Sequence, residues 1–327
     1  MVEASVIKKI LRELALKLLR MTCVSVLLFS VAGYCGLLHR YLELTSHFRV
    51  QYLFIAIACA VSFFLFRARR WLIVSAFVVL LNAAVVAPWY LPTQAADPQS
   101  RSLRVLLANV LYSNRNYDAV LNLVRQEDPD VIVLQEAIPR WQRAMKPLTV
   151  SHPFTRITPD GTDNFIACYS RFPIEDAAVS ASAVHATFGL VAKLKVHGRE
   201  VSFISIHPPV PVTALEFPER NAQLAATAIV ARELHAPKIL IGDLNNTLWS
   251  PYFSNFVRES GLKVARRGFG VLPTWPTFLP PLMIPIDHCL VSDDIQVVDC
   301  RTGSKIGSDH LPLIVDLALP NENQTSP

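Results

Sequence analysis

Three long stretches in the first hundred residues contain no Asp, Glu, Lys or Arg: residues 21–38, 50–66 and 71–91. As a helix, each is about long enough to cross a hydrocarbon core roughly 30 Å thick. Apolar residues make up 52% of the chain and charged residues only 17%, which is too apolar for an ordinary soluble protein of 327 residues. The sequence therefore predicts an N-terminal membrane region, residues 1–91, with three transmembrane helices.

The basic residues that flank these stretches predict the orientation of the membrane region. By the positive-inside rule, the N-terminus and the second loop should be cytoplasmic, and everything after Leu91 should be outside. A cleaved signal peptide is the alternative for the first stretch, but two more spans follow it at once and no small-residue cleavage site is evident. We expect a multi-pass protein of a bacterial inner (cell) membrane whose C-terminal domain is periplasmic or extracytoplasmic. The basic residues lie before the first stretch and in the first and second loops, respectively: Lys8, Lys9, Arg12, Lys17 and Arg20; Arg40 and Arg49; Arg67, Arg69 and Arg70.

The net charge of +5 comes from the membrane region. Residues 1–100 hold ten Lys or Arg against four Asp or Glu, a balance of +6, and the rest hold 21 against 22, a balance of −1. The soluble part thus lacks the general basicity that tracks nucleic-acid phosphates, although a local patch is compatible with these numbers. Residues 6–17 alternate apolar and basic faces at helical spacing, which fits either an interfacial helix on an anionic leaflet or an extension of the first span.

After residue 91 the composition changes to a short polar linker, residues 92–102, then to one large domain, residues 103–320, and a polar tail, residues 321–327. At about 3.3–3.6 Å per residue the linker spans at most roughly 40 Å, so the domain stays near the bilayer. Many short apolar runs and few helical patterns predict antiparallel or mixed sheets packed together, not a doubly wound parallel sheet. The expected strands are residues 103–107, 131–134, 164–169, 190–196, 201–206, 238–241, 286–291, 295–298 and 311–317, and the expected helices are 116–126, 218–234 and 251–260.

Polar side chains stand at the ends of many of these predicted strands. Burying carboxylates, carboxamides and imidazoles is costly unless they bind something, so such clusters indicate a site. Residues placed this way can converge at one end of the sheets. The tetrapeptides 242–245 and 307–310 in particular suggest hydrolysis at phosphorus. The strand-end residues are Asn109, Gln135, Glu136, His207, Asp243, Asn245, Asp287, His288, Ser308, Asp309 and His310.

These motifs, in this order, resemble those of the endonuclease/exonuclease/phosphatase superfamily, which includes deoxyribonuclease I, exonuclease III, neutral sphingomyelinases and inositol polyphosphate 5-phosphatases. Together with the three predicted spans, the resemblance implies a membrane-anchored bacterial member with an α/β (α+β) fold. This fold would be a four-layered sandwich of two mixed, mainly antiparallel sheets flanked by helices, preceded by three transmembrane helices. Leu244 stands where the family usually has an aromatic residue, which we interpret as a packing change. The resemblance extends from about Leu103 to Leu319, and its signals are the Asn109 strand, Leu134-Gln135-Glu136, Ser170-Arg171-Phe172-Pro173-Ile174, His207, Gly242-Asp243-Leu244-Asn245, Ile286-Asp287-His288 and Ser308-Asp309-His310.

The resemblance implies a divalent-metal site for Mg²⁺ or Mn²⁺. Glu136 would be the main ligand, because a hard cation prefers carboxylates and keeps water and phosphate oxygens as its other ligands. Asn109 would assist through its side-chain oxygen, and Asp309 would contribute to a metal position or to hydrogen bonds with the phosphate. Alone, Glu136 would be interpreted as a solvated residue after a buried strand, so its role depends on the partner motifs.

The resemblance also implies five catalytic residues. Asp243 would orient or deprotonate the attacking water, and Asn245 would donate to the phosphoryl oxygens, although Gly-Asp-x-Asn is often only a turn. His310 would contact the scissile phosphate as general base or electrostatic stabiliser, and Asp287 would hold its imidazole in one tautomer and favour its charged form. His207 would add an imidazole on the leaving-group side, with a strand-capping histidine as the alternative. The choice of base between His310 and Asp243 stays open.

Two histidines and two cysteines stay outside this set. His288 should face away from the site if Asp287 faces in, because side chains alternate along a strand. His152 belongs to none of the motifs. Cys289 and Cys300 allow a disulfide across neighbouring strands, with buried free thiols as the alternative.

The leading hypothesis is a membrane-anchored, divalent-metal-dependent phosphoric ester hydrolase, a phosphodiesterase or endonuclease-like enzyme. Its partners would be a phosphoester substrate, either a nucleic acid or a lipid or small phosphoester, and the lipid bilayer; no protein partner is predicted. The alternative is a lipid-headgroup or small-molecule phosphatase or phosphodiesterase of the sphingomyelinase type. The proline-rich stretch 272–284 bears on this choice, as a rim that shapes substrate access or contacts the bilayer, or as a packed loop over a sheet edge. A catalytically inactive, membrane-tethered phosphate- or protein-binding module is disfavoured because Glu136, Asp243 and His310 are all present.

Overall fold

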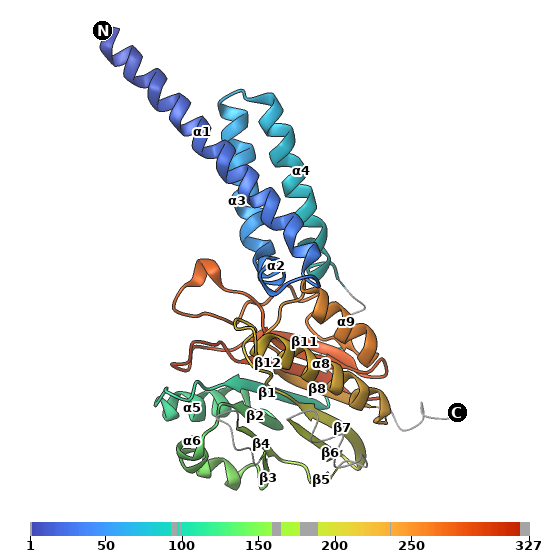
Figure 1. Ribbon diagram of the computed structural model, residues 1–327. Coiled ribbons are helices and arrows are strands. Elements are labelled where there is room, and N and C mark those ends of the chain that lie inside the picture. The colour runs from blue at the N-terminus through green and yellow to red at the C-terminus, as the bar shows by residue number, and fades with distance from the viewer. Residues whose placement is uncertain are drawn as a thin grey trace. The chain divides into compact units, whose positions relative to one another are not determined.

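The structure is a computed structural model that describes residues 2–92, 97, 100–158, 165–176, 189–235 and 237–320 (Figure 1). The chain forms two compact units. The first is Met1–Pro88 with Trp249–Pro251, and the second is Trp89–Leu248 with Tyr252–Pro327. The predicted tail, residues 321–327, and six of the eleven predicted linker residues lie outside the described residues.

The first unit is helical. Three segments are long and apolar enough to cross a membrane: Ser5–Cys35, Arg40–Leu65 and Arg69–Trp89. The three long apolar helices predicted from the sequence are therefore present, and their length and composition are those of membrane spans. The elements are α1 (Val2–Ala32), η1 (Gly33–Cys35), α2 (Arg40–Leu44), η2 (Thr45–Phe48), α3 (Arg49–Leu65), α4 (Arg69–Val86) and η3 (Ala87–Trp89).

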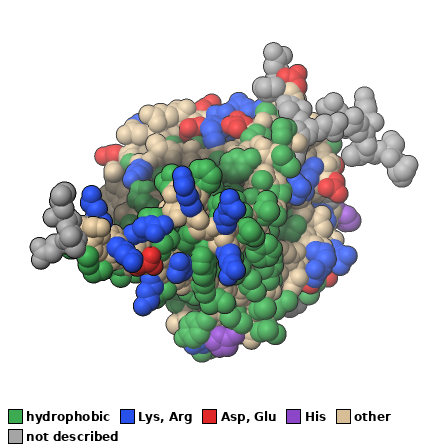
Figure 2. Space-filling view, turned by 90° about the horizontal axis from the view of Figure 1, so that it is seen from above, with side chains coloured by type: hydrophobic (Ala, Val, Ile, Leu, Met, Phe, Trp, Pro, Cys, Tyr) green, Lys and Arg blue, Asp and Glu red, His purple; other side chains and the backbone are tan. Residues whose placement is uncertain are grey.

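Helix α1 begins well before the first predicted span. The basic stretch 6–17 is part of this one helix, so it forms an extension of the first span and not a separate helix. Arg12 Nη2 donates to Phe66 O at 3.3 Å, and the Arg20 guanidinium lies 5.9 Å from the centre of the Trp71 ring. Seen from the end of the molecule at which α1 begins, Lys and Arg side chains stand among hydrophobic ones (Figure 2).

Buried polar side chains join the helices of the first unit. Asn82 on α4 donates through Nδ2 to Ser30 Oγ on α1 at 2.9 Å. Arg49, at the start of α3, donates through Nη1 to the Ser30 carbonyl at 2.6 Å. All three residues are buried. Because apolar contacts discriminate little between helix faces in lipid, such hydrogen bonds help to fix which faces pack together.

The second unit contains two six-stranded mixed sheets. The first has the order β11-β12-β1-β2-β4-β3, in which only β1 and β2 pair in parallel. The second has the order β5-β6-β7-β8-β10-β9, in which only β7 and β8 pair in parallel. The strands are β1 (Leu103–Asn109), β2 (Val131–Gln135), β3 (Phe154–Ile157), β4 (Ile166–Ser170), β5 (Ile174–Asp176), β6 (Leu190–Val196), β7 (Arg199–Ser205), β8 (Lys238–Asp243), β9 (Lys263–Val264), β10 (Asp287–Val291), β11 (Gln296–Thr302) and β12 (Leu313–Ala318).

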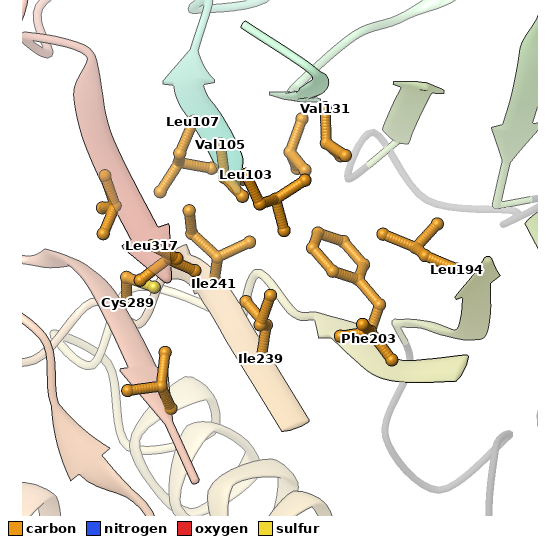
Figure 3. Packing of buried hydrophobic residues seen from close by; sticks show 14 of the residues in the cluster. Leu103, Val105, Leu107, Val131, Leu194, Phe203, Ile239, Ile241, Cys289 and Leu317 are labelled. Atoms are coloured by element: carbon orange, nitrogen blue, oxygen red, sulfur yellow. The ribbon is translucent and has the colours of Figure 1, made fainter. Parts of the chain in front are cut away.

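The two sheets pack face to face through an apolar core (Figure 3). Val105 and Leu107 of β1 and Ile239 and Ile241 of β8 point into it. Residues between them point the other way, since side chains alternate along a strand. The expected mixed, mainly antiparallel sandwich is confirmed. Its helices are α5 (Tyr117–Glu127), α6 (Pro139–Ala144), α8 (Glu216–Glu233) and α9 (Pro251–Ser260), with short 3-10 turns η5 (Lys146–Val150) and η6 (Pro280–Leu282).

Helix α5 covers the outer face of the first sheet. Its residues Val120 and Leu123 pack with Leu106 of β1 and Ile132 of β2 in a second apolar cluster. These strand residues alternate with those that face the other sheet, so β1 and β2 are buried on both sides. This explains why both read as continuous apolar runs in the sequence.

Some elements differ from the sequence-based expectation. The strands β3, β5 and β9 and the helix α6 were not predicted, because runs of two to six residues carry too little periodicity. Strand β11 extends to Thr302, beyond the predicted end at residue 298. Its later part is polar because Arg301 forms ion pairs with Asp299 and Asp316. The predicted strand 164–169 corresponds to β4, and its first residue lies outside the described residues.

The two cysteines for which a disulfide was considered are free. Cys289 on β10 and Cys300 on β11 are both buried thiols. Burial raises the pKa of Cys300 to about 12 and that of Cys289 well above its usual value. Both therefore behave as small apolar core residues.

His152 is buried in the second unit, away from the strand-end motifs. Its Nε2 lies 2.8 Å from Pro129 O, which can only accept, so Nε2 carries the proton and Nδ1, 2.9 Å from Ser151 Oγ, accepts. Burial lowers the pKa of His152, against the Pro129 hydrogen bond and the charges of Asp128 and Asp130, while Arg171 lowers it further. The folded protein thus favours the neutral ring.

We predict that His152 makes the domain less stable in acid. A histidine whose pKa is lower in the folded state contributes stability above its unfolded pKa, about 6.5, and loses it as the pH falls through that value. Urea unfolding of the full chain in detergent should give a free energy of unfolding that declines below about pH 6.5, and less steeply in His152→Asn. The exposed residue His235 is the control: an equally weakened decline in His235→Asn would contradict the assignment.

Candidate active site

The predicted site residues come from the same end of both sheets. Asn109 ends β1 and Asp243 ends β8, while Glu136 directly follows β2. Asp287 begins β10, which is antiparallel to β8 and pairs Asp287 with Asp243. The carboxyl ends of β1, β2 and β8 and the amino end of β10 therefore lie together, and His310 reaches them from the loop before β12.

Asn109 joins two of the carboxylates. Its Nδ2 donates to Glu136 Oε1 at 3.0 Å and to Asp243 Oδ2 at 3.3 Å. Its Oδ1 accepts from Leu111 N at 3.1 Å. The amide nitrogen thus faces the carboxylates, whereas the sequence suggested a metal ligand through the oxygen. In this geometry Asn109 positions the carboxylates, and a ligand role would require its side chain to turn.

Glu136 has a second hydrogen bond and an unusual backbone. Its Oε2 accepts from Tyr112 N at 2.9 Å, so both carboxylate oxygens are oriented by donors. Its φ is +56°, in the left-handed region that non-glycine residues seldom adopt. Asn245 has a φ of +46°. Such conformations cost energy and concentrate at functional sites.

Gln135, recognised in the sequence only as part of a motif, links the two sheets. It is fully buried; its Nε2 donates to Ile206 O at 2.7 Å and its Oε1 accepts from Asp243 N at 2.8 Å. Gly242 is required at the same place, because an added Cβ would collide with Ile206 O. The glycine of the Gly-Asp-x-Asn motif is thus explained by the close approach of β8 to the end of β7.

Replacing Gln135 with Leu should destabilise the domain by about 3 kcal/mol. Leu keeps the volume but leaves the buried Asp243 N–H and Ile206 carbonyl without partners, at about 1–3 kcal/mol each. Urea unfolding of the full chain measures the change. The control is Gln126→Leu on the exposed face of α5, where little change is expected; equal losses at the two positions would show that Gln135 does not link the sheets.

His310 lies between two aspartates. Its Nδ1 is 2.9 Å from Asp287 Oδ2 and its Nε2 is 3.6 Å from Asp243 Oδ2. Burial lowers the pKa of His310, but Asp287 and Asp243 outweigh this and raise it to about 9. Asp287 therefore accepts from Nδ1–H, and the imidazolium form is favoured at neutral pH. The backbone N of His310 donates to Ser308 Oγ at 3.1 Å, and this hydroxyl donates to Asn109 O at 2.7 Å.

Asp243 also contacts the second predicted imidazole. His207 Nε2 is 3.5 Å from Asp243 Oδ2. Burial would lower the pKa of His207, yet its contact with Asp243 raises it. In turn, His310 and His207 hold the pKa of Asp243 below its usual value despite burial, so Asp243 is ionised. Asn245 N donates to Asp243 Oδ1 at 2.9 Å, and Asn245 Nδ2 donates to Pro208 O at 2.9 Å.

Asp309 is hydrogen-bonded to Trp275, an aromatic residue to which the sequence assigned no separate role. Its Oδ2 accepts from Trp275 Nε1 at 2.9 Å. The Trp275 ring is also 6.5 Å from that of His310. Ser308 Oγ lies 3.4 Å from Asp309 Oδ1. Trp275 thus links the proline-rich stretch to the loop that carries His310.

Two groups of residues have the donor chemistry for a divalent cation. The predicted group is Glu136, Asn109 and Asp309, in which the carboxylates suit Mg²⁺ or Mn²⁺. In the second group, ligand atoms of Asp243, Asp287 and His310 lie within 4.8 Å of one another. A cation there would have to replace the Asp287–His310 hydrogen bond, whereas Glu136 would hold an ion without breaking that bond.

A buried arginine behind the site was also missed. Arg266 is 1% exposed and donates to the carbonyls of Asp287, Val271 and Leu272. It holds the start of β10 against the loop that leads to Trp275. Arg266 stands next to Arg267, and an arginine pair gives no sequence signal that one member is buried.

The two excluded histidines have structural environments. His288 is buried, its Nε2 lies 2.7 Å from Asn246 O, and its ring is 4.5 Å from that of Phe253. Along β10 it alternates with Asp287, whose side chain contacts His310. His152 contacts Pro129, as described above.

Comparison with known proteins agrees with this geometry. The sequence model of the Endonuclease/Exonuclease/phosphatase family matches residues 106–310. The chain belongs to this family. The match begins in β1 and ends at His310, so it includes every predicted catalytic and metal-site residue. Members of the Endonuclease/Exonuclease/phosphatase family are metal-dependent phosphoester hydrolases.

Solved structures show the same fold. The chain is similar to an endonuclease/exonuclease/phosphatase from Beutenbergia cavernae DSM 12333, with 20% identity, a TM-score of 0.54 and coverage of 68% of this chain and 72% of that one. It is similar to D. rerio TDP2 complexed with single strand DNA product (18%, 0.53, 66% and 98%). It is also similar to the 3′ phosphatase NExo from Neisseria bound to product DNA hairpin (20%, 0.52, 65% and 98%). No curated protein matches the sequence significantly.

Proposed function

We propose that the protein is a membrane-anchored, divalent-metal-dependent phosphoric ester hydrolase, a phosphodiesterase or endonuclease-like enzyme. One observation carries the proposal: Asn109 bonds both Glu136 and Asp243, and Asp243 in turn contacts His310, which is held by Asp287. Carboxylates that suit a cation thus adjoin a buried imidazolium. An ion at Glu136 would supply a positive charge that binds and polarises the phosphoryl group.

The side chains have distinct parts in this reaction. Asp243 is ionised and accepts hydrogen bonds, so it orients the attacking water and takes its proton. His310, with a pKa of about 9, is charged and stabilises negative charge on the phosphoryl oxygens. His207 protonates the leaving oxygen, and Asn245 donates to the phosphate through the amide hydrogen that Pro208 O does not accept. Asp287 positions His310.

The membrane region gives this enzyme its location. We propose that the N-terminus is cytoplasmic and that the catalytic domain, residues 103–320, lies on the periplasmic or extracytoplasmic side of a bacterial inner membrane. The distribution of Lys and Arg around the three apolar helices supports this orientation. A C-terminal reporter that is active only in the cytoplasm would contradict it.

Two substrate classes are compatible with the site. The DNA products in the structures of TDP2 and NExo support a nucleic acid. The charge balance of −1 after residue 100 gives no general electrostatic support for a long polyanion. A lipid or small phosphoester is the second candidate, and the exposed side chain of Phe278, next to the Thr277–Asp309 hydrogen bond, favours the lipid.

The test uses the full-length protein in detergent with bis-p-nitrophenyl phosphate, DNA, RNA and phospholipid. Hydrolysis should require Mg²⁺ or Mn²⁺, stop on addition of EDTA and resume when the metal is restored. His310→Ala should abolish it. Metal binding without turnover on the whole panel would instead identify a catalytically inactive phosphate- or protein-binding module.

A further inference from the structure

The proline-rich stretch has an exposed apolar tip. Phe278 is 74% exposed, and Leu279 and Leu282 are 43% exposed each. The two residues between them, Pro280 and Pro281, are exposed as well. We call residues 278–282 the apolar tip. Five consecutive exposed apolar residues are more than scattered surface hydrophobics, and such patches mark interaction sites.

The base of the tip is fixed to the candidate active site. Thr277 N donates to Asp309 O at 2.8 Å, and Thr277 Oγ1 donates to Ser308 O at 2.9 Å. Trp275, two residues earlier, donates to the Asp309 carboxylate. Strand-like hydrogen bonds between Trp275 and Ile284 close the loop below the tip. The tip is therefore rigidly connected to the residues next to His310 and is not a loose loop.

The proline-rich stretch follows a turn, residues 268–270, that is hydrogen-bonded to the end of the third membrane segment. Within the second unit, Gly268 N and Gly270 N both donate to Trp89 O, at 3.0 and 2.9 Å. The Tyr90 ring packs on Gly270, where an added Cβ would meet it at 2.8 Å. Trp89 is the last residue of the membrane-spanning segment Arg69–Trp89. Trp and Tyr at the end of a span are typical of the membrane interface.

Chain length brings the tip within reach of the bilayer. Phe278 is eight residues after Gly270, which is at most roughly 29 Å of extended chain. A second exposed apolar loop leaves the site directly after His207, with Val210 at 49%, Val212 at 53% and Leu215 at 69% exposure. Apolar side chains therefore stand on segments that start from two different parts of the site.

We propose that the apolar tip inserts into the bilayer leaflet on the side of the domain and holds the active site over the phosphoester headgroups of membrane lipids. Continuity with the Trp89 end of the membrane segment selects lipid as the occupant over a soluble protein. Moving the large apolar side chains of Phe278, Leu279 and Leu282 from water into the acyl region favours this contact. The contact itself is independent of catalysis, whereas the lipid substrate rests on the proposed function.

The contact is tested with the full chain in phosphatidylcholine–phosphatidylglycerol liposomes. Cys35 is replaced by Ser, because the other described thiols are buried, and Phe278→Cys is labelled with an environment-sensitive fluorophore. Lipids that carry a nitroxide near the headgroup should quench the label severalfold. The matched control is Val150→Cys, at 89% exposure on the turn η5, which should remain unquenched. Equal quenching at the two positions would overturn the proposal.

A kinetic comparison tests the consequence for substrate. The double variant Phe278→Ser with Leu282→Ser should lower kcat/KM on a vesicle-borne phosphoester lipid by about tenfold or more, and leave hydrolysis of bis-p-nitrophenyl phosphate unchanged. Val150→Ser should change neither. Equal losses on both substrates would show that the tip only supports the fold of the site. If the wild type hydrolyses neither substrate, the proposed function fails, while the quenching result still decides the contact.

Discussion

Replacing Glu136 with Gln should reduce phosphodiester hydrolysis by about 10²–10³-fold and weaken Mn²⁺ binding by at least tenfold. The carboxylate charge that attracts the cation is lost, and a hard cation binds a neutral amide less well. The amide also introduces a donor where both oxygens of Glu136 now accept, from Asn109 Nδ2 and Tyr112 N. Rate losses of this size are typical when one group that stabilises transition-state charge is removed from an active site.

The measurement pairs Mn²⁺ titration calorimetry with hydrolysis by the full-length protein. The matched control is Glu127→Gln, in which the same change is made to a half-buried carboxylate that pairs with Arg301 at the end of α5. This variant should bind Mn²⁺ as the wild type does. Unchanged Mn²⁺ affinity in Glu136→Gln would place the cation elsewhere, with Asp243, Asp287 and His310 as the remaining candidate group.

Much of this site could be predicted because its residues stand at the ends of buried runs. Asn109 and Asp243 each end an apolar strand, and the pattern that predicts the strand also gives the point where a side chain leaves the core. The contacts that link these strand ends across the two sheets could not be predicted. Gln135 contacts Ile206 and Asp243 only because two sheets pack together, and no local pattern encodes that packing.

The sequence also did not predict the orientation of the side chains in the site. Asn109 was expected to offer its oxygen to a cation, but the turn that follows β1 brings Leu111 N to that oxygen. An Asn side chain that bonds the backbone two residues ahead is a common local device, and here it directs the amide nitrogen at the carboxylates. The buried Arg266 was missed because charged residues are taken as exposed unless their partners are known, and its partners are backbone carbonyls.

Asp287→Asn should be nearly as damaging as the change at Glu136, although Asp287 contacts no reacting atom in the proposed mechanism. Asp287 is the charge that most strongly favours protonated His310, against the burial that opposes it. In the variant, Asn can still accept from Nδ1–H but brings no charge, so the pKa of His310 should fall from about 9. Loss of the orienting carboxylate behind a catalytic histidine can cost up to about 10⁴ in rate, and we expect about 10³ here.

The pKa of His310 can be followed by nuclear magnetic resonance of the imidazole nitrogens in metal-free protein, alongside the rate of hydrolysis. The control is Asp293→Asn, an exposed carboxylate just beyond the other end of β10, which should alter neither. A purely structural role for Asp287 would lower activity and stability together and leave the pKa of His310 unchanged in the folded fraction. A fall in both the pKa and the rate, with the fold intact, would mean that Asp287 acts on the reaction through the charge of His310.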